Sequence, residues 1–414
     1  MVYDAAANNT VLFGGVTTSG GVVASGVLGD TWTWNGSDWR QRFPLTSPSP
    51  RYGHAMVFDV FTNNVVLFGG ISSSGVILND TWTWDGVNWA QKFPATSPPA
   101  RFNPGMAYHR AGGLVVLFGG ANLLNLSGLD DTWTWDGADW TRRFPVTSPP
   151  ARYAPATANH TPSKKLVLFG GVGGSGDLGD TWTWNGLDWK QEFPAVSPAA
   201  REYASATYDG AGGSVVLFGG TTESAVFFQD TWTWNGSEWT QEFPAISPSP
   251  RAAFGLSYDG PRVDLVLFGG ESPTGSPLDD TWTGTVSSSY LVTVTASPGI
   301  LPANGVTTSK VTATVLDTAG TPAAGIFVTF STTVGLLTAP TTRVTDVAGQ
   351  VTDTIASPLA GTATVTATVL GTAFAAHVDV TFLPTFAEFE LLVERWLTFW
   401  AFSTCRPCPP PSAP

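Results

Sequence analysis

One stretch of this chain, Asp30-Thr-Trp-Thr-Trp-Asn-Gly-Ser-Asp-Trp39, recurs almost unchanged along the sequence. A Leu-Phe-Gly-Gly motif stands before each copy, and a Phe-Pro pair follows each of the first five. A strict period near 50 residues with strand-like patterning indicates one repeated supersecondary unit and is typical of a β-propeller. Later copies begin at Asp80, Asp131, Asp180 and Asp230, and a shortened copy begins at Asp280.

Each repeat predicts four strands, of which the first three are clearest in the second unit. Residues 54–59 are expected to form the innermost strand. Residues 64–70 contain a nearly continuous apolar run, which suits a strand buried on both faces. Residues 80–84 alternate Thr and Trp, so both indoles point to one face of the sheet.

A hairpin signal leads from the third strand to the fourth. Asp85-Gly86 tolerates the positive φ angles of a tight turn, and equivalent Asn-Gly or Asp-Gly pairs recur in the other complete repeats. The outer strand is expected over residues 88–93, with Trp89 and Phe93 on one face. Stacked aromatic side chains between neighbouring sheets are expected to form the core.

The two ends of the repeat array differ from its interior. The first unit begins within its innermost strand at Met1, and the last stops after Trp282, with Gly284 where a second Trp is expected. We therefore expect an all-β, six-bladed propeller whose last blade lacks its outer strand. The closing strand is expected in sequence upstream of Met1, which would leave the true number of blades and any signal peptide undefined. An open last blade would expose a strand edge that favours aggregation.

Together, the Leu-Phe-Gly-Gly motif, the Asp-x-Trp-x-Trp strand and the later Trp resemble the Kelch repeat family over roughly residues 1–284. The resemblance implies four-stranded blades around a central channel but no single activity, because this fold hosts enzymes and binding modules alike. It also raises the copper oxidases of the galactose oxidase type, whose Tyr–Cys cofactor needs a cysteine in the propeller. The two cysteines of the chain are Cys405 and Cys408, so this activity is excluded and no cofactor is expected.

Residues 285–383 lack tryptophan and contain Val/Thr-rich strands at roughly ten-residue intervals, which predicts a β-sandwich. The segments Asp317-Thr-Ala-Gly320, Val328-Thr-Phe-Ser331 and Thr345-Asp-Val-Ala-Gly349 resemble the group 1 bacterial immunoglobulin-like domain of intimin and invasin adhesins. This resemblance implies an extracellular spacer or adhesive stalk. The strands are expected at residues 290–295, 308–316, 326–331, 349–355, 361–369 and 377–382.

Residues 384–414 fit neither domain. The apolar stretch 386–402 carries Glu388, Glu390 and Glu394 and is short for a membrane span. It is compatible with an anchor helix, a disordered end or a sequencing artefact.

Composition narrows the choice of partners and location. Charged residues make up 12% of the chain, about half the usual share, and the net charge is −13. Nucleic acid and anionic membrane surfaces are therefore poor partners, and no membrane insertion of the propeller is expected. Low charge and Thr/Gly-rich strands suit an exported protein, and we expect it to be monomeric. The four histidines do not cluster in the pattern of repeats, so no metal site is expected.

An arginine recurs before the first strand of most repeats and could form an anion-binding ring. Each repeat also places an aspartate on the same face, at the start of the third strand, so we expect structural Arg–Asp pairs instead. The arginines are Arg51, Arg101, Arg152, Arg201 and Arg251.

Function is better sought where the repeat is broken, because loops on a rigid scaffold carry variation at low cost. The loops between second and third strands differ most, and their apolar residues predict a partner-binding rim, although ordinary loop packing would explain them as well. The candidate binding residues are Leu123, Leu124, Glu223, Phe227 and Phe228. The acids that depart from the repeat are Glu202, Glu223 and Glu271.

The sequence thus favours a non-catalytic binding or adhesion protein, extracellular or on the bacterial cell surface, whose loop rim binds a protein or glycan. The alternative is a carbohydrate-active hydrolase or lyase with carboxylates in the channel, which would require the off-pattern acids to converge. A third hypothesis is a structural surface-layer component without a specific ligand.

Overall fold

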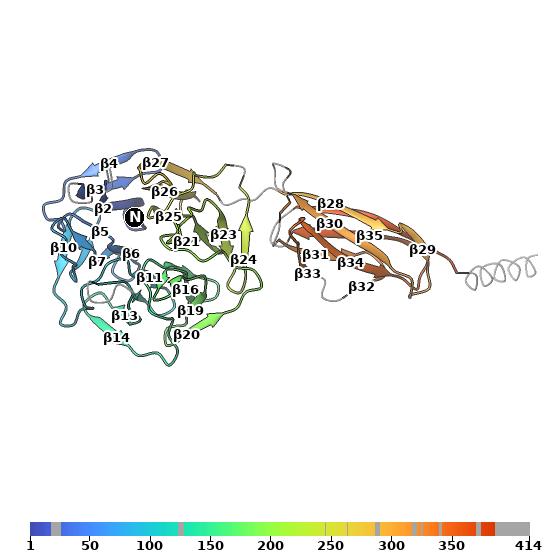
Figure 1. The fold of residues 1–414 in the computed structure, drawn as a ribbon, viewed down its shortest axis with the longest axis horizontal. Helices are drawn as coiled ribbons and strands as arrows, with labels where there is room; N and C mark the ends of the chain where they lie inside the picture. Colours follow the sequence, from blue (N-terminus) through green and yellow to red (C-terminus); the bar gives the residue numbers. More distant parts are fainter. Residues whose placement is uncertain are drawn as a thin grey trace, which may run out of the picture. The chain divides into compact units, whose positions relative to one another are not determined.

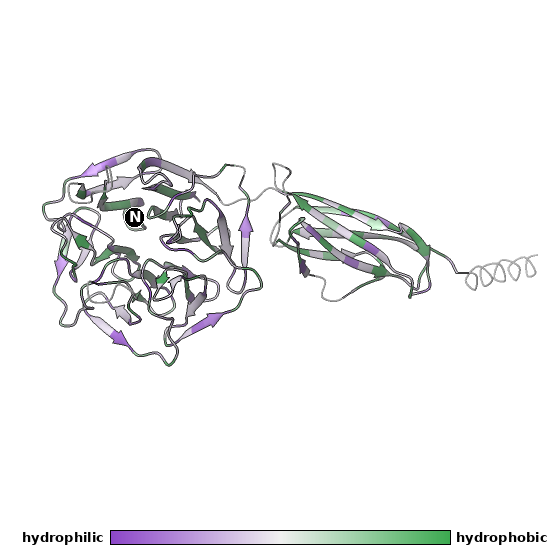
Figure 2. Cartoon of the chain, in the orientation of Figure 1, coloured by the Kyte–Doolittle hydropathy of each residue, from purple (hydrophilic) through white to green (hydrophobic). Residues whose placement is uncertain are grey.

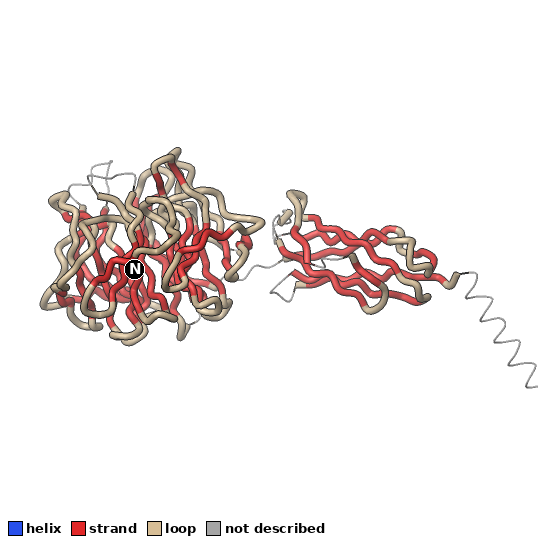
Figure 3. The backbone as a smooth tube through the Cα atoms, turned by 90° about the horizontal axis from the view of Figure 1, so that it is seen from below, coloured by secondary structure: helices blue, strands red, loops and turns tan. Residues whose placement is uncertain are grey.

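The computed structural model describes a chain of strands and loops that divides into two units, residues 1–288 and 289–414. No helix occurs among the described residues, and therefore none with the length and apolarity needed to cross a membrane (Figure 3). The structure describes residues 1–17, 26–122, 128–244, 246–262, 264–285, 290–316, 320, 322–323, 326–338, 342–369 and 374–385.

The first unit is a six-bladed propeller, with its blades arranged around a central axis (Figure 1). Five blades are four-stranded antiparallel meanders in which the strands follow chain order from axis to rim, and the last blade has three strands. The expected absence of its outer strand is confirmed for the described residues.

The strands of the first three blades are as follows. Blade 1 has β1 (Val2–Asp4), β2 (Asn9–Val16), β3 (Val27–Trp34) and β4 (Trp39–Arg42); blade 2 has β6 (Ala55–Asp59), β7 (Asn64–Phe68), β9 (Thr81–Trp84) and β10 (Trp89–Lys92); blade 3 has β11 (Gly105–His109), β12 (Leu114–Phe118), β13 (Thr132–Trp135) and β14 (Trp140–Arg143).

The remaining blades follow the same order. Blade 4 has β15 (Ala156–His160), β16 (Lys165–Phe169), β19 (Thr181–Trp184) and β20 (Trp189–Glu192); blade 5 has β21 (Ser205–Asp209), β22 (Ser214–Phe218), β23 (Thr231–Trp234) and β24 (Trp239–Glu242); blade 6 has β25 (Gly255–Asp259), β26 (Asp264–Glu271) and β27 (Pro277–Gly284).

Loops cover the two faces of the propeller (Figure 3). One face carries the loops between second and third strands together with the segments that enter the first strands, and we call it the loop face. In blade 2 these two parts pair as β5 (Arg51–Tyr52) and β8 (Ile71–Ser72). The hairpin turns lie on the opposite face, which we call the turn face.

The core lies between neighbouring blades, as expected. The second strand is buried on both sides, and in β7 all four residues from Val65 to Phe68 have no exposed surface. Phe68 packs edge-on against Trp140 of the next blade, with ring centroids 5.2 Å apart. Strands near the axis are apolar, whereas the rim strands are hydrophilic (Figure 2).

The Gly-Gly doublet allows neighbouring backbones to approach closely. Gly69 has φ +69°, and a Cβ there would lie 2.6 Å from the carbonyl oxygen of Arg101 in the next blade. A larger residue would therefore meet both backbone strain and a steric clash. The first glycine of the doublet approaches the arginine carbonyl of the next blade in the same way in each of blades 1 to 5, at 2.5–2.7 Å.

One detail of the outer strand is predicted wrongly. Trp89 is 1% exposed, but Phe93 is 85% exposed and does not share its buried face. The strand ends at Lys92 and the chain turns at Pro94, so the alternation of faces stops before Phe93. The equivalent phenylalanines, Phe43, Phe144 and Phe193, are also 80–83% exposed.

The second unit is a β-sandwich, and all six expected strands are present. Its buried residues alternate along the strands, so that Val311, Ala313 and Val315 have no exposed surface. One sheet contains β28 (Leu291–Ser297), β30 (Ser309–Leu316), β34 (Gln350–Ala356) and β32 (Leu336–Leu337); the other contains β29 (Ile300–Pro302), β36 (Ala375–Leu383), β35 (Gly361–Val369), β31 (Phe327–Thr332) and β33 (Thr342–Val344). Residues 386–414, the greater part of the tail, lie outside the described residues.

Candidate functional site

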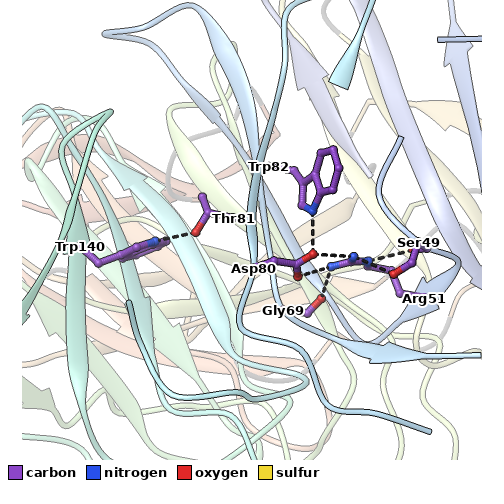
Figure 4. A network of polar contacts seen from close by, with 7 residues as sticks. All are labelled: Ser49, Arg51, Gly69, Asp80, Thr81, Trp82 and Trp140. Atoms are coloured by element: carbon purple, nitrogen blue, oxygen red, sulfur yellow. Dashed lines mark hydrogen bonds and ion pairs between the residues drawn. The ribbon is translucent and has the colours of Figure 1, made fainter. Parts of the chain in front are cut away.

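The recurrent arginine is part of a buried polar network in each blade from the second to the sixth (Figure 4). In blade 2, Arg51 donates two hydrogen bonds to the carboxylate of Asp80, at 2.6 and 2.8 Å, and a third to the Gly69 carbonyl at 3.1 Å. The indole N–H of Trp82 donates to the same carboxylate at 2.7 Å. Burial alone would raise the pKa of Asp80, but the hydrogen bonds and charge of Arg51 outweigh it and leave the pKa lowered.

These pairs confirm that the recurrent arginines serve the fold. All five are at most 1% exposed, so none is free to bind an anion from solution. Asp30 of blade 1 accepts a hydrogen bond from Trp32, but no arginine among the described residues pairs with it. The other pairs are Arg101–Asp131, Arg152–Asp180, Arg201–Asp230 and Arg251–Asp280.

An arc of backbone hydrogen bonds, which we call the collar, runs around the axis on the loop face. Each blade from the second to the sixth contributes one residue with positive φ, and from the third blade on its N–H donates to the carbonyl of the collar residue in the preceding blade at 2.7–3.2 Å. The collar fixes the mouth of the channel on rigid backbone. Its members are Gly53, Asn103, Ala154, Tyr203 and Ala253.

Beneath the collar, a cavity of about 890 Å³ runs along the innermost strands. At its turn-face end, tyrosines on the first strands bond across blade boundaries. Tyr258, for example, accepts a hydrogen bond from the backbone N–H of Ala211 at 3.1 Å. Tyr108 and Tyr208 stand at the equivalent positions of blades 3 and 5 and line the same cavity, together with Arg110 and Asn159.

A buried carboxylate without a basic partner lies on the loop face, beside the collar. Glu202 pairs with Thr221 through two backbone hydrogen bonds of 2.8 and 2.9 Å. Its side chain is 8% exposed, and no hydrogen bond or ion pair to its carboxylate occurs within the described part of the chain. The other repeats place uncharged side chains at this position: Tyr52, Phe102, Tyr153 and Ala252.

Two further carboxylates, Asp177 and Glu223, lie within electrostatic range of Glu202. Asp177 is in the short strand β18 (Gly176–Asp177) of blade 4, and its Oδ2 accepts the backbone N–H of Glu223 at 2.9 Å. Its Oδ1 is buried and has no partner among the described residues. The Glu223 carboxylate points toward blade 4, because a Cβ added to Gly176 would lie 3.3 Å from its Oε2. We call these three carboxylates the acidic mouth.

The acidic mouth has an unusual electrostatic character. Burial, and then the charges of Asp177 and Glu223, raise the pKa of Glu202 to about 7. Burial and the same carboxylates raise the pKa of Tyr153, whose ring is 6.4 Å from that of Phe102. Near neutral pH the acidic mouth therefore carries negative charge, no basic side chain of the described residues pairs with Glu202, and a positively charged group would relieve this charge.

Tyr203 borders the acidic mouth and is held firmly in place. Its hydroxyl accepts a hydrogen bond from the Asn103 side chain at 3.0 Å, across the intervening Ala154 of the collar. Burial and the charge of Glu202 raise the pKa of Tyr203. This side chain remains neutral and offers an aromatic surface next to the carboxylates.

The predicted binding residues divide into three groups. Leu123 and Leu124 lie outside the described residues. Glu223 is exposed and belongs to the acidic mouth, while Phe227 is half-buried beside Phe228 in the same loop. Phe228 already has a partner within the protein, because its ring stacks on the guanidinium of Arg201, whose Cζ lies 3.9 Å from the ring centroid.

Sequence reasoning missed Asp177 and Tyr153 as neighbours of Glu202, and Asn103 as the hydrogen-bond partner of Tyr203. One signal was available, since Glu202 replaces an uncharged residue of the repeat. The approach of Asp177 from blade 4 depends on how adjacent blades pack, and repeat alignment does not show it. Glu271, the third off-pattern acid, is exposed, and its charge raises the pKa of Tyr203 only as a minor cause.

Among the described residues, no group of three or more His, Cys, Asp and Glu side chains is arranged to hold a metal ion. The turn-face histidines instead join blades: His109 Nε2 is 3.0 Å from the carbonyl oxygen of Lys164, and His160 Nε2 is 3.2 Å from that of Gly213. Burial lowers the pKa of both, so they remain neutral at physiological pH.

Comparison with known families agrees with the architecture. Residues 1–185 match the KLHDC2/KLHL20/DRC7 Kelch-repeats domain, and residues 291–383 match the bacterial Ig-like domain (group 1). Comparison with curated proteins gives no match. Kelch repeats followed by a bacterial Ig-like domain indicate a protein-interaction or adhesion-type role.

Proposed function

We propose, from the premise that a Kelch-repeat propeller and a bacterial Ig-like domain share one chain, that the protein is a non-catalytic adhesion or binding protein. It acts outside the cell or on the bacterial surface. The loop face of the propeller binds an extracellular protein or glycan, and the Ig-like domain serves as the spacer.

The observation that carries this proposal is Glu202, a residue only 8% exposed whose carboxylate has no hydrogen-bond or ion-pair partner among the described residues and whose pKa is raised to about 7. Partly desolvating a charge without a partner costs free energy, and a positively charged group of a ligand would recover that cost. The acidic mouth adds two more carboxylates and the rings of Tyr153 and Tyr203. This combination suits a positively charged group, such as a lysine or arginine side chain of a partner protein, which carboxylates and aromatic faces both attract.

The test is retention of the full chain on an array of host-matrix proteins and glycans. We expect selective retention that the Glu202→Gln and Glu223→Gln variants weaken. Asp38→Asn is the matched control, because Asp38 is exposed on the turn face and its replacement removes the same charge. Retention that both kinds of variant leave unchanged, or no retention by the folded chain, would contradict the proposal.

One specific observation favours the alternative that the protein is a hydrolase or lyase. Burial and the charges of Asp177 and Glu223 raise the pKa of Glu202 to about 7, and a carboxyl group with a raised pKa can hold a proton near neutral pH, as a general acid must. Screening polysaccharides for cleavage separates the two functions. Turnover that the Glu202→Gln variant loses would favour catalysis over binding.

A further inference from the structure

The wall of the central cavity is formed largely by the edges of strands. Each innermost strand (β1, β6, β11, β15, β21 and β25) pairs with one neighbour only, so its other edge faces the axis (Figure 1). The side chains of these strands point into the spaces between blades. In β11, Met106 belongs to the core cluster of Phe68 in blade 2, and the next residue, Ala107, belongs to that of Leu168 in blade 4.

An unpaired strand edge presents hydrogen-bond donors and acceptors together. Along an antiparallel strand, alternate residues direct their N–H and C=O groups away from the paired neighbour, and in these strands that direction is the axis. The protein itself shows that a hydroxyl group fits this edge, because Thr157 of blade 4 donates its hydroxyl to the carbonyl of Met106 at 3.2 Å. The cavity therefore offers donors and acceptors at short intervals on every side.

The side chains around the cavity carry almost no charge. Of the described residues that line it, Arg110 has the one charged side chain, and this residue is exposed at the turn-face end. The other side chains are apolar or carry hydroxyl or amide groups. Deeper than Arg110, an ionised group of a ligand would lose its hydration without gaining a side chain of opposite charge. The cavity therefore suits an uncharged ligand.

Aromatic rings surround the turn-face end of the cavity. Burial raises the pKa of Tyr3, Tyr108 and Tyr258, so these side chains stay uncharged at neutral pH. The ring of Tyr208 packs edge-on against that of His160, with centroids 6.1 Å apart. Such rings offer apolar faces on which a ligand can stack. The residues at this position of the six innermost strands, in chain order, are Tyr3, Phe58, Tyr108, Asn159, Tyr208 and Tyr258, and all of them line the cavity.

The size of the cavity limits what can enter. Its volume of about 890 Å³ lies in the range of small-molecule sites. Most innermost strands have five residues, as β11 does, and are therefore about 16 Å long. Spread over this length, the volume corresponds to a passage about 8 Å wide. A space of this shape admits the end of one slender chain and excludes a folded domain.

We propose that the central cavity binds the end of an uncharged glycan chain, which enters from the turn face. Sugar hydroxyls both donate and accept, so they bond N–H and C=O groups of several strand edges at once and replace the bonds that water makes there. The apolar faces of the sugar rings stack on the tyrosines at the mouth. An extended peptide fits less well, because it pairs with one edge at a time and its side chains meet no pockets. This site is at the opposite end of the propeller from the acidic mouth and does not depend on it.

The experiment is calorimetric titration of the full chain with cellotetraose, maltotetraose, mannotetraose and xylotetraose as uncharged probes. Tetragalacturonate is the charged probe, and a Ser-Gly repeat peptide with blocked ends is the peptide probe. We expect saturable binding of at least one uncharged oligosaccharide and much weaker binding of the other two probes. Equal or stronger binding of tetragalacturonate or of the peptide, or no binding of any uncharged oligosaccharide by the folded chain, would overturn the proposal.

Variants at the mouth locate the binding. Tyr108→Ala should weaken it about fivefold, whereas Tyr108→Phe keeps the ring and should change it by less than about twofold. Asn159→Tyr completes the circle of rings with a residue that four other blades accept at this position, and should strengthen binding about threefold. Phe61→Ala is the matched control, because Phe61 is an exposed aromatic residue of the turn face that does not line the cavity.

Thermal unfolding of each variant shows whether it is folded. Equal weakening by Tyr108→Ala and Phe61→Ala would place the binding outside the cavity and contradict the proposal. If Tyr108→Ala fails to fold, Asn159→Tyr still decides, since a folded variant with unchanged or weaker binding would argue against stacking at the mouth.

Discussion

The loop face contains two kinds of buried carboxylate, and they differ in how their charge is satisfied. Asp131 lies in a network with Arg101 and Trp133. Burial alone would raise the pKa of Asp131, but the hydrogen bonds and charge of Arg101 outweigh burial, and the pKa is lowered. Glu202 has no basic partner, and its pKa is raised to about 7. The paired acids occur at the repeat position and hold the blades together. The unpaired acid breaks the repeat, and the fold would be more stable without its charge.

The largest expected effect of the paired aspartates is a loss of stability at low pH. The pKa of each paired aspartate is below its unfolded value near 3.8, and that of Asp280 is about 2. A lowered folded pKa contributes stability that is complete above the unfolded pKa and is lost as pH falls through the folded value. We expect the propeller to lose stability steeply between pH 4 and pH 2.

Denaturant unfolding followed by tryptophan emission measures this loss, because no tryptophan lies in residues 285–383. The Asp131→Asn variant should lose less stability over the same interval, since one of the five pairs is already broken. Equal losses in this variant and the parent chain would argue against the pairs as the cause.

Breaking a single pair should have the next largest effect. Asp131→Asn leaves the fully buried Arg101 without its carboxylate, and we expect the free energy of unfolding to fall by about 3–5 kcal/mol at pH 7. Asp30→Asn is the matched control at the same repeat position, where only Trp32 donates to the carboxylate. It should cost about 1 kcal/mol. Similar losses in the two variants would remove the distinction between paired and unpaired aspartates.

Removing the unpaired charge should act in the opposite direction. The folded pKa of Glu202 is above its unfolded value of 4.5, so its ionisation reduces stability as pH rises from 4.5 to 7, and the penalty persists above that. We expect Glu202→Gln to stabilise the propeller by about 2 kcal/mol at pH 8 and to have little effect at pH 4. Unfolding measured at both pH values checks this, and a variant destabilised at pH 8 would indicate a partner for Glu202.

The smallest effect compares a threonine that accepts an indole hydrogen bond with an equivalent threonine that accepts none among the described residues. Thr132 accepts the indole N–H of Trp189 at 3.0 Å, so Thr132→Val should cost about 1 kcal/mol. Thr231 has no such donor among the described residues, and Thr231→Val should leave stability within about 0.5 kcal/mol of the parent chain. Thermal unfolding of the two variants gives the comparison, and equal costs would mean that Thr231 already makes an equivalent hydrogen bond.

The sequence determined the repeated architecture because each blade is built from local signals. The Thr-Trp alternation, the Asp-Gly and Asn-Gly turns and the Gly-Gly doublet specify strands and turns within about fifty residues, and repetition specifies how the blades pack. The missing outer strand of blade 6 and the Arg–Asp pairs followed from counting repeat positions. The exposure of Phe93 could not be predicted in this way, because the alternating sequence pattern continues past Lys92, where the strand ends.

Only the tertiary structure decided which off-repeat residues meet. Glu202 is visible in the sequence as a departure from the pattern, but Asp177 reaches it from another blade, 25 positions earlier in the chain. Phe228 reads as an exposed anchor in the sequence, yet it stacks on Arg201. The physical reason is that the repeat encodes contacts between equivalent positions, whereas contacts between non-equivalent side chains depend on the geometry of adjacent blades.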